Sequence, residues 1–282
     1  MPESMQSYQH KIVAWAQANP SVRAVIMTGS MARPTAPKTR WSDLDIELYF
    51  DDPTPYVASE EWIYGFGEVW VILPLENPGW HPTRLTWFAG GEKVDFSVKS
   101  VNSLQHMIEA DELSEMYQRG YQVLVDKDGL AAQLAPSPFK RPTPQSPTFE
   151  DFDFTVREFW FEAMHVAQYI AARELWTVKF RDAEVKYALL RMLEWHGQFV
   201  LGNTVYHTGK RMVEWSDTWD EVHNIWSHFS ALDSWLAFHK TIALFDRVGR
   251  DVAAKLDFVY PVERVDKMKA YMQDLYTEDT LL

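Results

Sequence analysis

Two segments decide the fold: residues 25–30, which read VIMTGS, and residues 43–50, which read DLDIELYF. The first begins as an apolar, β-branched run typical of a buried strand, and it ends at a Gly-Ser pair, where glycine permits a tight turn. Side chains alternate between the two faces of a strand. We therefore expect Asp43, Asp45 and Glu47 on one face of the second strand and the apolar residues between them on the other.

Two neighbouring carboxylates on one strand repel each other unless a cation lies between them, and hard divalent ions such as Mg²⁺ prefer carboxylate oxygens. The turn at Gly29 and Ser30 offers backbone N–H groups and a hydroxyl group to a phosphate. A metal site beside a phosphate cradle suits phosphoryl or nucleotidyl transfer. The alternative is an edge strand with ordinary exposed charges, which the preceding apolar strand and the Gly-Ser turn disfavour.

These segments resemble a known signature. Gly29-Ser30 followed by Asp43-x-Asp45 is similar to the G-S…D-x-D motif of the polymerase-β-like nucleotidyltransferase superfamily. The surrounding residues 23–34 (RAVIMTGSMARP) and 42–46 (SDLDI) resemble the aminoglycoside 6-adenylyltransferase (streptomycin adenylyltransferase) family more closely. Residues 175–196 resemble the same family with lower specificity, so the resemblance covers both halves of the chain.

A third acidic residue comes from a predicted hairpin. Residues 84–88 and 93–98 read as two strands joined by Ala89-Gly90-Gly91-Glu92. The resemblance implies that Asp95 joins Asp43 and Asp45 as catalytic and metal-binding carboxylates. In this superfamily the third acid either binds metal or accepts the proton of the attacking hydroxyl group, and both roles stay open here. The alternative is a hairpin aspartate that faces solvent.

Four residues are candidates for nucleotide binding. Gly29 and Ser30 would seat the phosphates. Arg40 lies in the connecting segment 31–42, from which it could reach the phosphates or simply face solvent. Lys179 lies in the second segment that resembles the adenylyltransferases, and the resemblance assigns it to the nucleotide phosphates.

Four acidic residues are candidates for acceptor binding. The resemblance suggests Asp182 or Glu184 for the ammonium or guanidinium groups of an aminoglycoside. Glu158 and Glu162 share the polar face of a helix predicted around residues 156–170. That face could line a cleft for a cationic substrate or be an ordinary solvated surface.

The domain organisation follows from a change in composition. Residues 1–135 are expected to form an α/β (α+β) nucleotidyltransferase domain with a mixed twisted sheet, preceded by a helix over residues 4–17 that Ser4 caps. Residues 136–149 are rich in proline and predict a semi-rigid linker. Residues 150–282 predict an all-α bundle that binds the acceptor. Its second helix is expected to follow Asp182, and two more are expected over 233–248 and 261–275. The cleft between the domains would hold ATP and the acceptor.

Composition and the absence of certain motifs limit the partners and the functional classes that the protein can have. The formal charge is −13, from 27 basic and 40 acidic residues, which disfavours nucleic acid as a partner. The charge suits a cationic small molecule, and it suits plain solubility equally well. The sequence has no cysteine and no apolar run long enough to cross a membrane, and its first residues, Met1-Pro2-Glu3-Ser4, lead us to expect no secretory signal. We expect a cytoplasmic monomer. Motifs for a serine hydrolase elbow, a P-loop or a Rossmann fold are absent from the sequence.

The resemblance implies a specific reaction. It is the Mg²⁺-dependent transfer of AMP from ATP, the co-substrate, to a hydroxyl group of a streptomycin-like aminoglycoside, with release of pyrophosphate and antibiotic resistance as the outcome. Two alternatives remain at this point. One is a nucleotidyltransferase that modifies another small molecule or a protein, for instance as an antitoxin. The other is a catalytically idle nucleotide-binding module.

Overall fold

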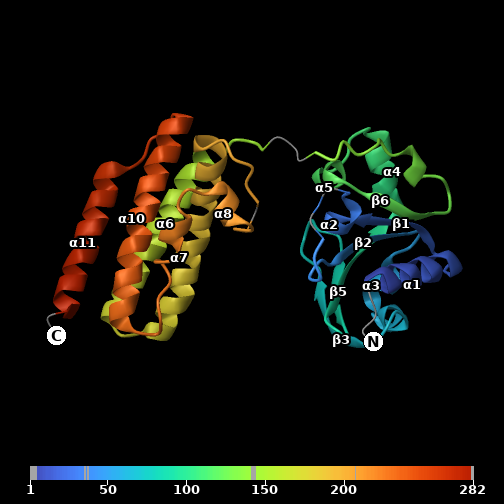
Figure 1. Cartoon of the computed structure of the whole chain (residues 1–282), viewed down its shortest axis with the longest axis horizontal. Coiled ribbons are helices and arrows are strands. Elements are labelled where there is room, and N and C mark those ends of the chain that lie inside the picture. Colours follow the sequence, from blue (N-terminus) through green and yellow to red (C-terminus); the bar gives the residue numbers. More distant parts are fainter. Residues whose placement is uncertain (1–4, 35, 37, 141–143, 207, 281–282) are drawn as a thin grey trace. The chain divides into compact units, whose positions relative to one another are not determined.

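The structure is a computed structural model that describes residues 5–34, 36, 38–140, 144–206 and 208–280. The chain divides into two compact units, Met1–Pro144 and Gln145–Leu282, and most of their helices and strands are labelled in Figure 1. Each unit is described by itself below. The predicted cap Ser4 lies outside the described residues.

The first unit is built on a six-stranded mixed sheet with the strand order β3-β4-β5-β2-β1-β6. The parallel pair is β2 with β5, and the other neighbouring strands are antiparallel. The predicted mixed sheet is therefore confirmed. The strands are β1 (Val22–Thr28), β2 (Leu44–Phe50), β3 (Val69–Leu75), β4 (Thr83–Phe88), β5 (Glu92–Ser100) and β6 (Gln122–Asp126).

Helices cover the two faces of this sheet. On one face α1 (Met5–Ala18) packs its buried residues Tyr8 and Ile12 against apolar side chains of the strands, including Leu44 and Ile46. On the opposite face Tyr49 packs in a smaller core with residues of α4 (Val101–Glu109) and α5 (Glu115–Arg119). The segment that follows β5 therefore contains two separate helices. Shorter elements are α2 (Gly29–Ala32), α3 (Thr54–Ala58), η1 (Glu61–Gly65) and η2 (Ala131–Gln133).

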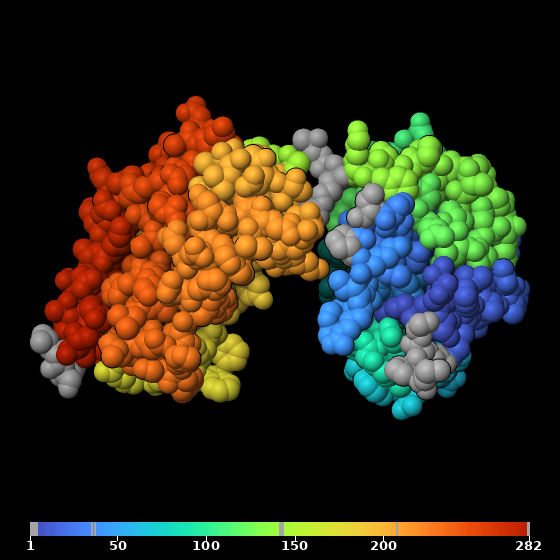
Figure 2. Space-filling model, viewed as in Figure 1, coloured from blue at the N-terminus to red at the C-terminus, as the bar shows by residue number. Residues whose placement is uncertain are grey.

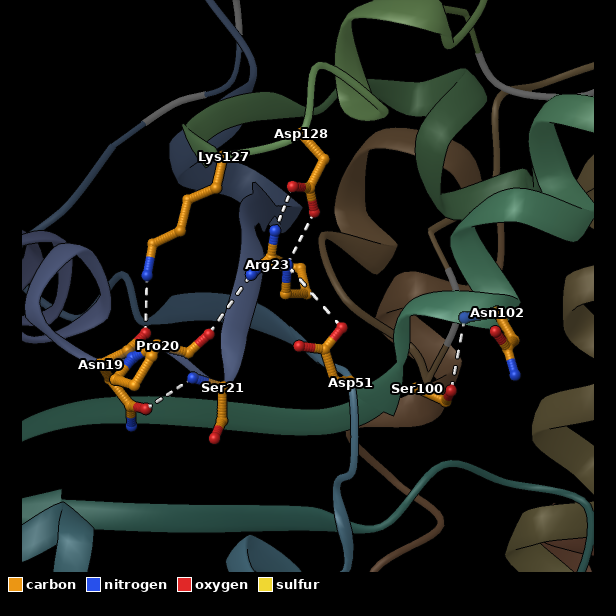
Figure 3. A network of polar contacts seen from close by, with 9 residues as sticks. All are labelled: Asn19, Pro20, Ser21, Arg23, Asp51, Ser100, Asn102, Lys127 and Asp128. Carbon is orange, nitrogen blue, oxygen red and sulfur yellow. Dashed lines mark hydrogen bonds and ion pairs between the residues drawn. The ribbon is translucent and has the colours of Figure 1, made fainter.

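A polar network joins one end of β1 to the ends of its two neighbours, β2 and β6 (Figure 3). The guanidinium group of Arg23 in β1 donates two hydrogen bonds to Asp128 beyond β6, and its Nε lies 3.7 Å from Asp51 at the end of β2. Lys127 donates to the carbonyl oxygen of Asn19 at 2.6 Å. These contacts tie β1, β2 and β6 together at the end of the sheet that is opposite to the Gly-Ser turn after β1.

The second unit is a helical bundle. Its long helices are α6 (Phe149–Ala171), α7 (Leu175–Trp195), α10 (Ala231–Leu256) and α11 (Val262–Thr280). They enclose one apolar core, in which Phe159 and Phe245 stack with ring centroids 3.5 Å apart. Thr148 forms a reciprocal capping box with Asp151 at the start of α6. The prediction of an all-α fold for the second part of the chain is confirmed.

One predicted helix boundary is wrong. The second helix begins at Leu175, so Asp182 and Glu184 lie within α7 instead of at its acidic start. A helix interior tolerates Asp182 because Lys186, one turn later, donates to its Oδ1 at 2.5 Å. Between α7 and α10 the chain forms η3 (His196–Val200), α8 (Met212–Trp215) and α9 (Trp219–Val222). No helix in the described part of the chain has the length and apolar character to cross a membrane.

Candidate active site

Three carboxylates meet on two neighbouring strands. Asp43 immediately precedes β2, Asp45 lies in β2, and Asp95 lies in β5. The parallel register places Asp45 directly beside Asp95. One oxygen from each of the three carboxylates can be chosen so that all lie within 4.8 Å of one another. The residues expected to form the acidic cluster are therefore close enough to share a cation.

The end of β1 lies against this cluster. Thr28 pairs with Asp45 across the β1–β2 ladder, and Gly29 follows with a φ of +67°. A Cβ atom on Gly29 would lie 1.7 Å from Oδ2 of Asp45, which leaves no room for any side chain. Glycine is thus required here both for its backbone conformation and for the close approach of the carboxylate. Ser30 is the next residue and lies in the short helix α2.

Burial and neighbouring charges raise the pKa values of two of the three acids. Burial, reinforced by the charges of Asp43 and Asp95, raises the pKa of Asp45 to about 6, against the opposing effect of Lys93 and Arg33. Burial also raises the pKa of Asp95, while its hydrogen bond with Lys93 acts in the opposite direction. Carboxyl groups that are costly to ionise in an isolated fold gain most from a bound cation.

Lys93, which was not predicted from the sequence, lies against two of the three acids. Nζ of Lys93 donates to Oδ2 of Asp43 at 3.0 Å and to Oδ2 of Asp95 at 2.7 Å. The alternation of β5 could have indicated this contact, because residues two apart on a strand share a face. Lys93 therefore provides a positive charge in direct contact with two of the acids.

The donor set fits a hard divalent cation. All three side chains offer oxygen, and Oδ1 of Asp95 is buried without a hydrogen-bond partner among the described residues. A buried carboxylate oxygen of this kind is costly unless a ligand satisfies it. Oxygen donors that converge in this way suit Mg²⁺ and similar ions.

The raised pKa of Asp45 predicts an unusual dependence of stability on pH. Its ordinary value is 3.8 and its value in the folded chain is about 6, so between these pH values the folded state binds more protons than the unfolded state. The free energy of unfolding contributed by Asp45 should therefore rise as pH falls from 7 towards 4, by at most about 3 kcal/mol. Urea unfolding of the unaltered protein and of Asp45→Asn in EDTA at pH 7.5 and 5.0 checks this, because the difference between the two proteins isolates Asp45 from other titrating groups such as His81 and His239. A stabilising effect of Asp45→Asn that does not shrink as pH falls would contradict it, and Mg²⁺ should stabilise the unaltered protein at pH 7.5.

Arg40 lies on the surface. It is exposed, and its guanidinium group stacks on the ring of Trp41 at 4.0 Å from the centroid. Trp41 is itself 75% exposed. The segment that carries both residues forms part of the visible surface of the first unit, in lighter blue in Figure 2. Arg40 is thus available for an anionic ligand, and the structure does not bring it into contact with the acidic cluster.

Lys179 has several partners within the helical unit. Its ammonium group donates to Oγ of Ser227 at 2.5 Å, to the carbonyl oxygen of His228 at 2.7 Å and to Oγ of Ser234 at 3.2 Å. Burial lowers its pKa, while the charges of Asp182 and Asp233 oppose this effect. In this structure Lys179 fastens the segment before α10 to α7.

The acidic candidates of the helical unit are mostly paired with basic side chains. Arg181 donates to both carboxylate oxygens of Glu162 at 3.0 and 3.1 Å, and Arg191 donates to Glu158 at 3.1 Å. Asp182 accepts from Lys186, as described above. Glu184 is exposed and forms no ion pair with the described residues. The predicted polar face of α6 is thus largely an interface of ion pairs with α7.

Glu47 lies in β2, two residues after Asp45, and next to the acidic cluster. It shares the strand face of Asp45, accepts hydrogen bonds from Tyr49 and Tyr117 at 2.7 Å, and lies 2.8 Å from Nζ of Lys99. These contacts satisfy Glu47 with donors from three elements. Because its oxygens are already occupied, Glu47 supports the sheet behind the acidic cluster and does not extend it.

The mixed sheet carries a Gly-Ser turn at the end of β1 and three converging carboxylates at its neighbours in the sheet, β2 and β5. This combination defines the class of the protein as a nucleotidyltransferase. The comparison with known families agrees. Residues 3–275 match the profile of the streptomycin adenylyltransferase family, and the chain belongs to that family. The resemblance found in the sequence is confirmed, and the chain is an enzyme of the nucleotidyltransferase class.

Several relatives carry a common name. An aminoglycoside 6-adenylyltransferase from Campylobacter jejuni is 25% identical over 271 residues, which cover 89% of this chain and 88% of the relative. One from Bacillus subtilis (strain 168) is 24% identical over 254 residues, with 85% and 87% covered. A crystal structure of an aminoglycoside 6-adenyltransferase from Bacillus subtilis aligns with 97% of this chain and 99% of that chain, at 20% identity and a TM-score of 0.44.

Proposed function

We propose that this enzyme transfers AMP from ATP to a hydroxyl group of a streptomycin-like aminoglycoside and releases pyrophosphate, in a reaction that depends on Mg²⁺. The observation that carries the proposal is the convergence of Asp43, Asp45 and Asp95 beside Gly29. The names of the relatives, which are aminoglycoside 6-adenylyltransferases, supply the class of acceptor. Modification of the antibiotic would give resistance.

The acidic cluster would provide the metal site. Asp43 and Asp45 would hold the cation, and Asp95 could add Oδ1, which has no hydrogen-bond partner among the described residues. Bound Mg²⁺ would neutralise charge on the phosphate oxygens during the transfer. The raised pKa of Asp95 also suits the alternative role, in which this carboxylate accepts the proton of the attacking hydroxyl group.

The phosphates would lie at the end of β1. Gly29 allows them to approach the backbone, and Ser30 offers its N–H and hydroxyl groups. Arg40, which is exposed, can add a positive charge. Lys179 would have to release Ser227 and its other acceptors before it could bind a phosphate.

The helical unit would bind the cationic acceptor. Glu184 is the exposed carboxylate of the four candidates that is not paired with a basic side chain among the described residues, so we place it first. Glu158, Glu162 and Asp182 would have to exchange their present partners for ammonium or guanidinium groups of the acceptor. We propose a monomer in the cytoplasm, because one chain contains all of these groups and ATP is abundant there.

One assay tests the proposal. Purified enzyme is incubated with ATP, Mg²⁺ and a panel of aminoglycosides that includes streptomycin, and pyrophosphate release is measured while mass spectrometry detects the adenylylated product. We expect release with streptomycin and none after Asp43→Asn. Release with other acceptors alone would reject streptomycin but retain the chemistry. No release with any acceptor would reject the proposed activity.

A further inference from the structure

We propose that Lys93 is a tethered counter-ion of the divalent-cation site: its ammonium group holds Asp43 and Asp95 together in the metal-free enzyme and leaves them when the cation binds. This inference rests on the proposed function, which places a divalent cation on the same carboxylates. It assigns Lys93 a role in controlling how readily the site accepts the metal.

The contacts of Lys93 identify the competition. Its Nζ lies 3.0 Å from Oδ2 of Asp43 and 2.7 Å from Oδ2 of Asp95, and both residues belong to the cluster that can hold a metal ion. Mg²⁺ binds carboxylate oxygens at about 2.0–2.1 Å and demands well-defined geometry. The ammonium group and a cation bound by these two side chains would therefore be neighbouring positive charges that compete for the same two carboxylate groups.

The position of Lys93 allows it to leave. It is the second residue of β5, directly after the turn formed by Gly90 and Gly91, and 24% of its side chain is exposed. A lysine is a point charge on a flexible four-carbon stem, so it can release one anion and turn towards solvent or another anion. Lys93 thus makes two short contacts with carboxylates, and its side chain is partly exposed to solvent, so it can move away from them.

Lys99 provides the contrast within the same strand. It lies on the same face of β5 and is paired with Glu47 at 2.8 Å, but only 12% of its side chain is exposed, as is 11% of that of Glu47. Its partner is outside the cluster of Asp43, Asp45 and Asp95. Lys99 therefore has the charge and the strand position of Lys93 without its contact with the metal ligands, which makes Lys99→Met a matched control.

The proposal predicts opposite effects with and without metal. In the metal-free enzyme, loss of Lys93 leaves carboxylates that repel one another, so the melting temperature in EDTA should fall. In the presence of metal, the same loss removes a competitor. Because one neighbouring charge typically shifts an ionic equilibrium tenfold or more, the affinity of Lys93→Met for Mn²⁺ should be at least about tenfold higher than that of the unaltered enzyme.

The experiment compares three full-length proteins: the unaltered enzyme, Lys93→Met and Lys99→Met. Free Mn²⁺ is measured by electron paramagnetic resonance during a titration without nucleotide, and melting is followed in EDTA and in saturating Mn²⁺. We expect tighter binding and a larger stabilisation by metal for Lys93→Met. Lys99→Met should bind Mn²⁺ within about twofold of the unaltered enzyme, which separates contact with the ligands from a general loss of positive charge.

The outcomes are distinct. Equal or weaker Mn²⁺ binding by Lys93→Met would overturn the role of Lys93 and leave the proposed metal site intact. If none of the three proteins binds Mn²⁺, the proposed metal site fails as well. Should Lys93→Met not fold, NMR of the unaltered enzyme labelled with ¹⁵N at lysine Nζ gives the answer, with Lys93→Arg to assign the signal. A Lys93 signal unchanged by saturating Mg²⁺ would reject displacement.

Discussion

Replacing Asp45 by asparagine is expected to reduce adenylyl transfer by at least about 10³-fold, equivalent to about 4 kcal/mol of transition-state stabilisation, while it makes the metal-free protein more stable. Activity falls because an amide lacks the charge that binds the cation. Stability rises because burial and the charges of Asp43 and Asp95 already raise the pKa of Asp45 to about 6. At pH 7.5 the neutral amide avoids that repulsion, with a gain of at most about 3 kcal/mol.

Two measurements separate these effects. Pyrophosphate release under saturating ATP and acceptor gives the loss of activity, and urea unfolding in EDTA gives the change in stability. Asp51→Asn is the control, because Asp51 directly follows the same strand, its side chain is 62% exposed and its ion-pair contact with Arg23 is 3.7 Å long. It should change both quantities little. An Asp45→Asn protein that is both active and destabilised would show that Asp45 serves the fold and not the reaction.

Gly29→Ala is expected to cause the second large effect, a loss of activity of at least about 10²-fold together with destabilisation. The new methyl group would lie 1.7 Å from Oδ2 of Asp45, and the φ of +67° disfavours alanine. The left-handed conformation alone costs about 1–2 kcal/mol. The remaining strain can be relieved only if Asp45 or the turn moves, and a misplacement of about 1 Å at a reacting centre can cost 10²-fold.

Gly129→Ala is the matched control for this prediction. Gly129 has a φ of +70°, but no atom lies within 4 Å of the position that a Cβ atom would take. The control should therefore show only the cost of the backbone conformation and retain activity. Pyrophosphate assays and thermal melts of both variants check the comparison. Equal activity of Gly29→Ala and Gly129→Ala would mean that the close approach of Gly29 to Asp45 has no catalytic importance.

The core of the first unit was predictable because its signals are local. Alternation along residues 43–50 places Asp45 on one strand face, and the apolar run before Gly29 defines the neighbouring strand. The meeting of Asp45 with Asp95 was different, because these residues belong to strands separated by β3 and β4 in the sequence. No spacing rule gives that register, and it was available only through the resemblance to a family.

The start of α7 was misjudged for a physical reason. Residues 182–184 are acidic or small, as expected for the first turn of a helix, and the preceding residues include aromatic and β-branched side chains with modest helix propensity. Tertiary contacts override this local preference: Val178 is buried in the bundle core, and Lys179 is held by acceptors from the segment before α10.

Side-chain partners on different elements were the least predictable feature of the candidate site. Glu162 and its partner Arg181 are 19 positions apart, and Glu158 and Arg191 are 33 apart. A polar stripe on one helix therefore looks the same in the sequence whether it faces a substrate or a second helix. Lys93 could have been identified, because it lies two residues before Asp95 on the same strand.

The parallel pairing of β2 with β5 divides the first unit into a part that can be engineered freely and a part that cannot. Residues 51–91 leave β2, form β3 and β4, and return to β5 directly beside it. An insertion in the exposed turn around Trp80, which is 80% exposed, lengthens this excursion without changing the register of Asp45 and Asp95. A single residue added between Lys93 and Asp95 would instead turn one of them to the opposite face of the sheet. Insertions in the first unit should therefore be placed in this turn, and the length of β5 should be kept fixed.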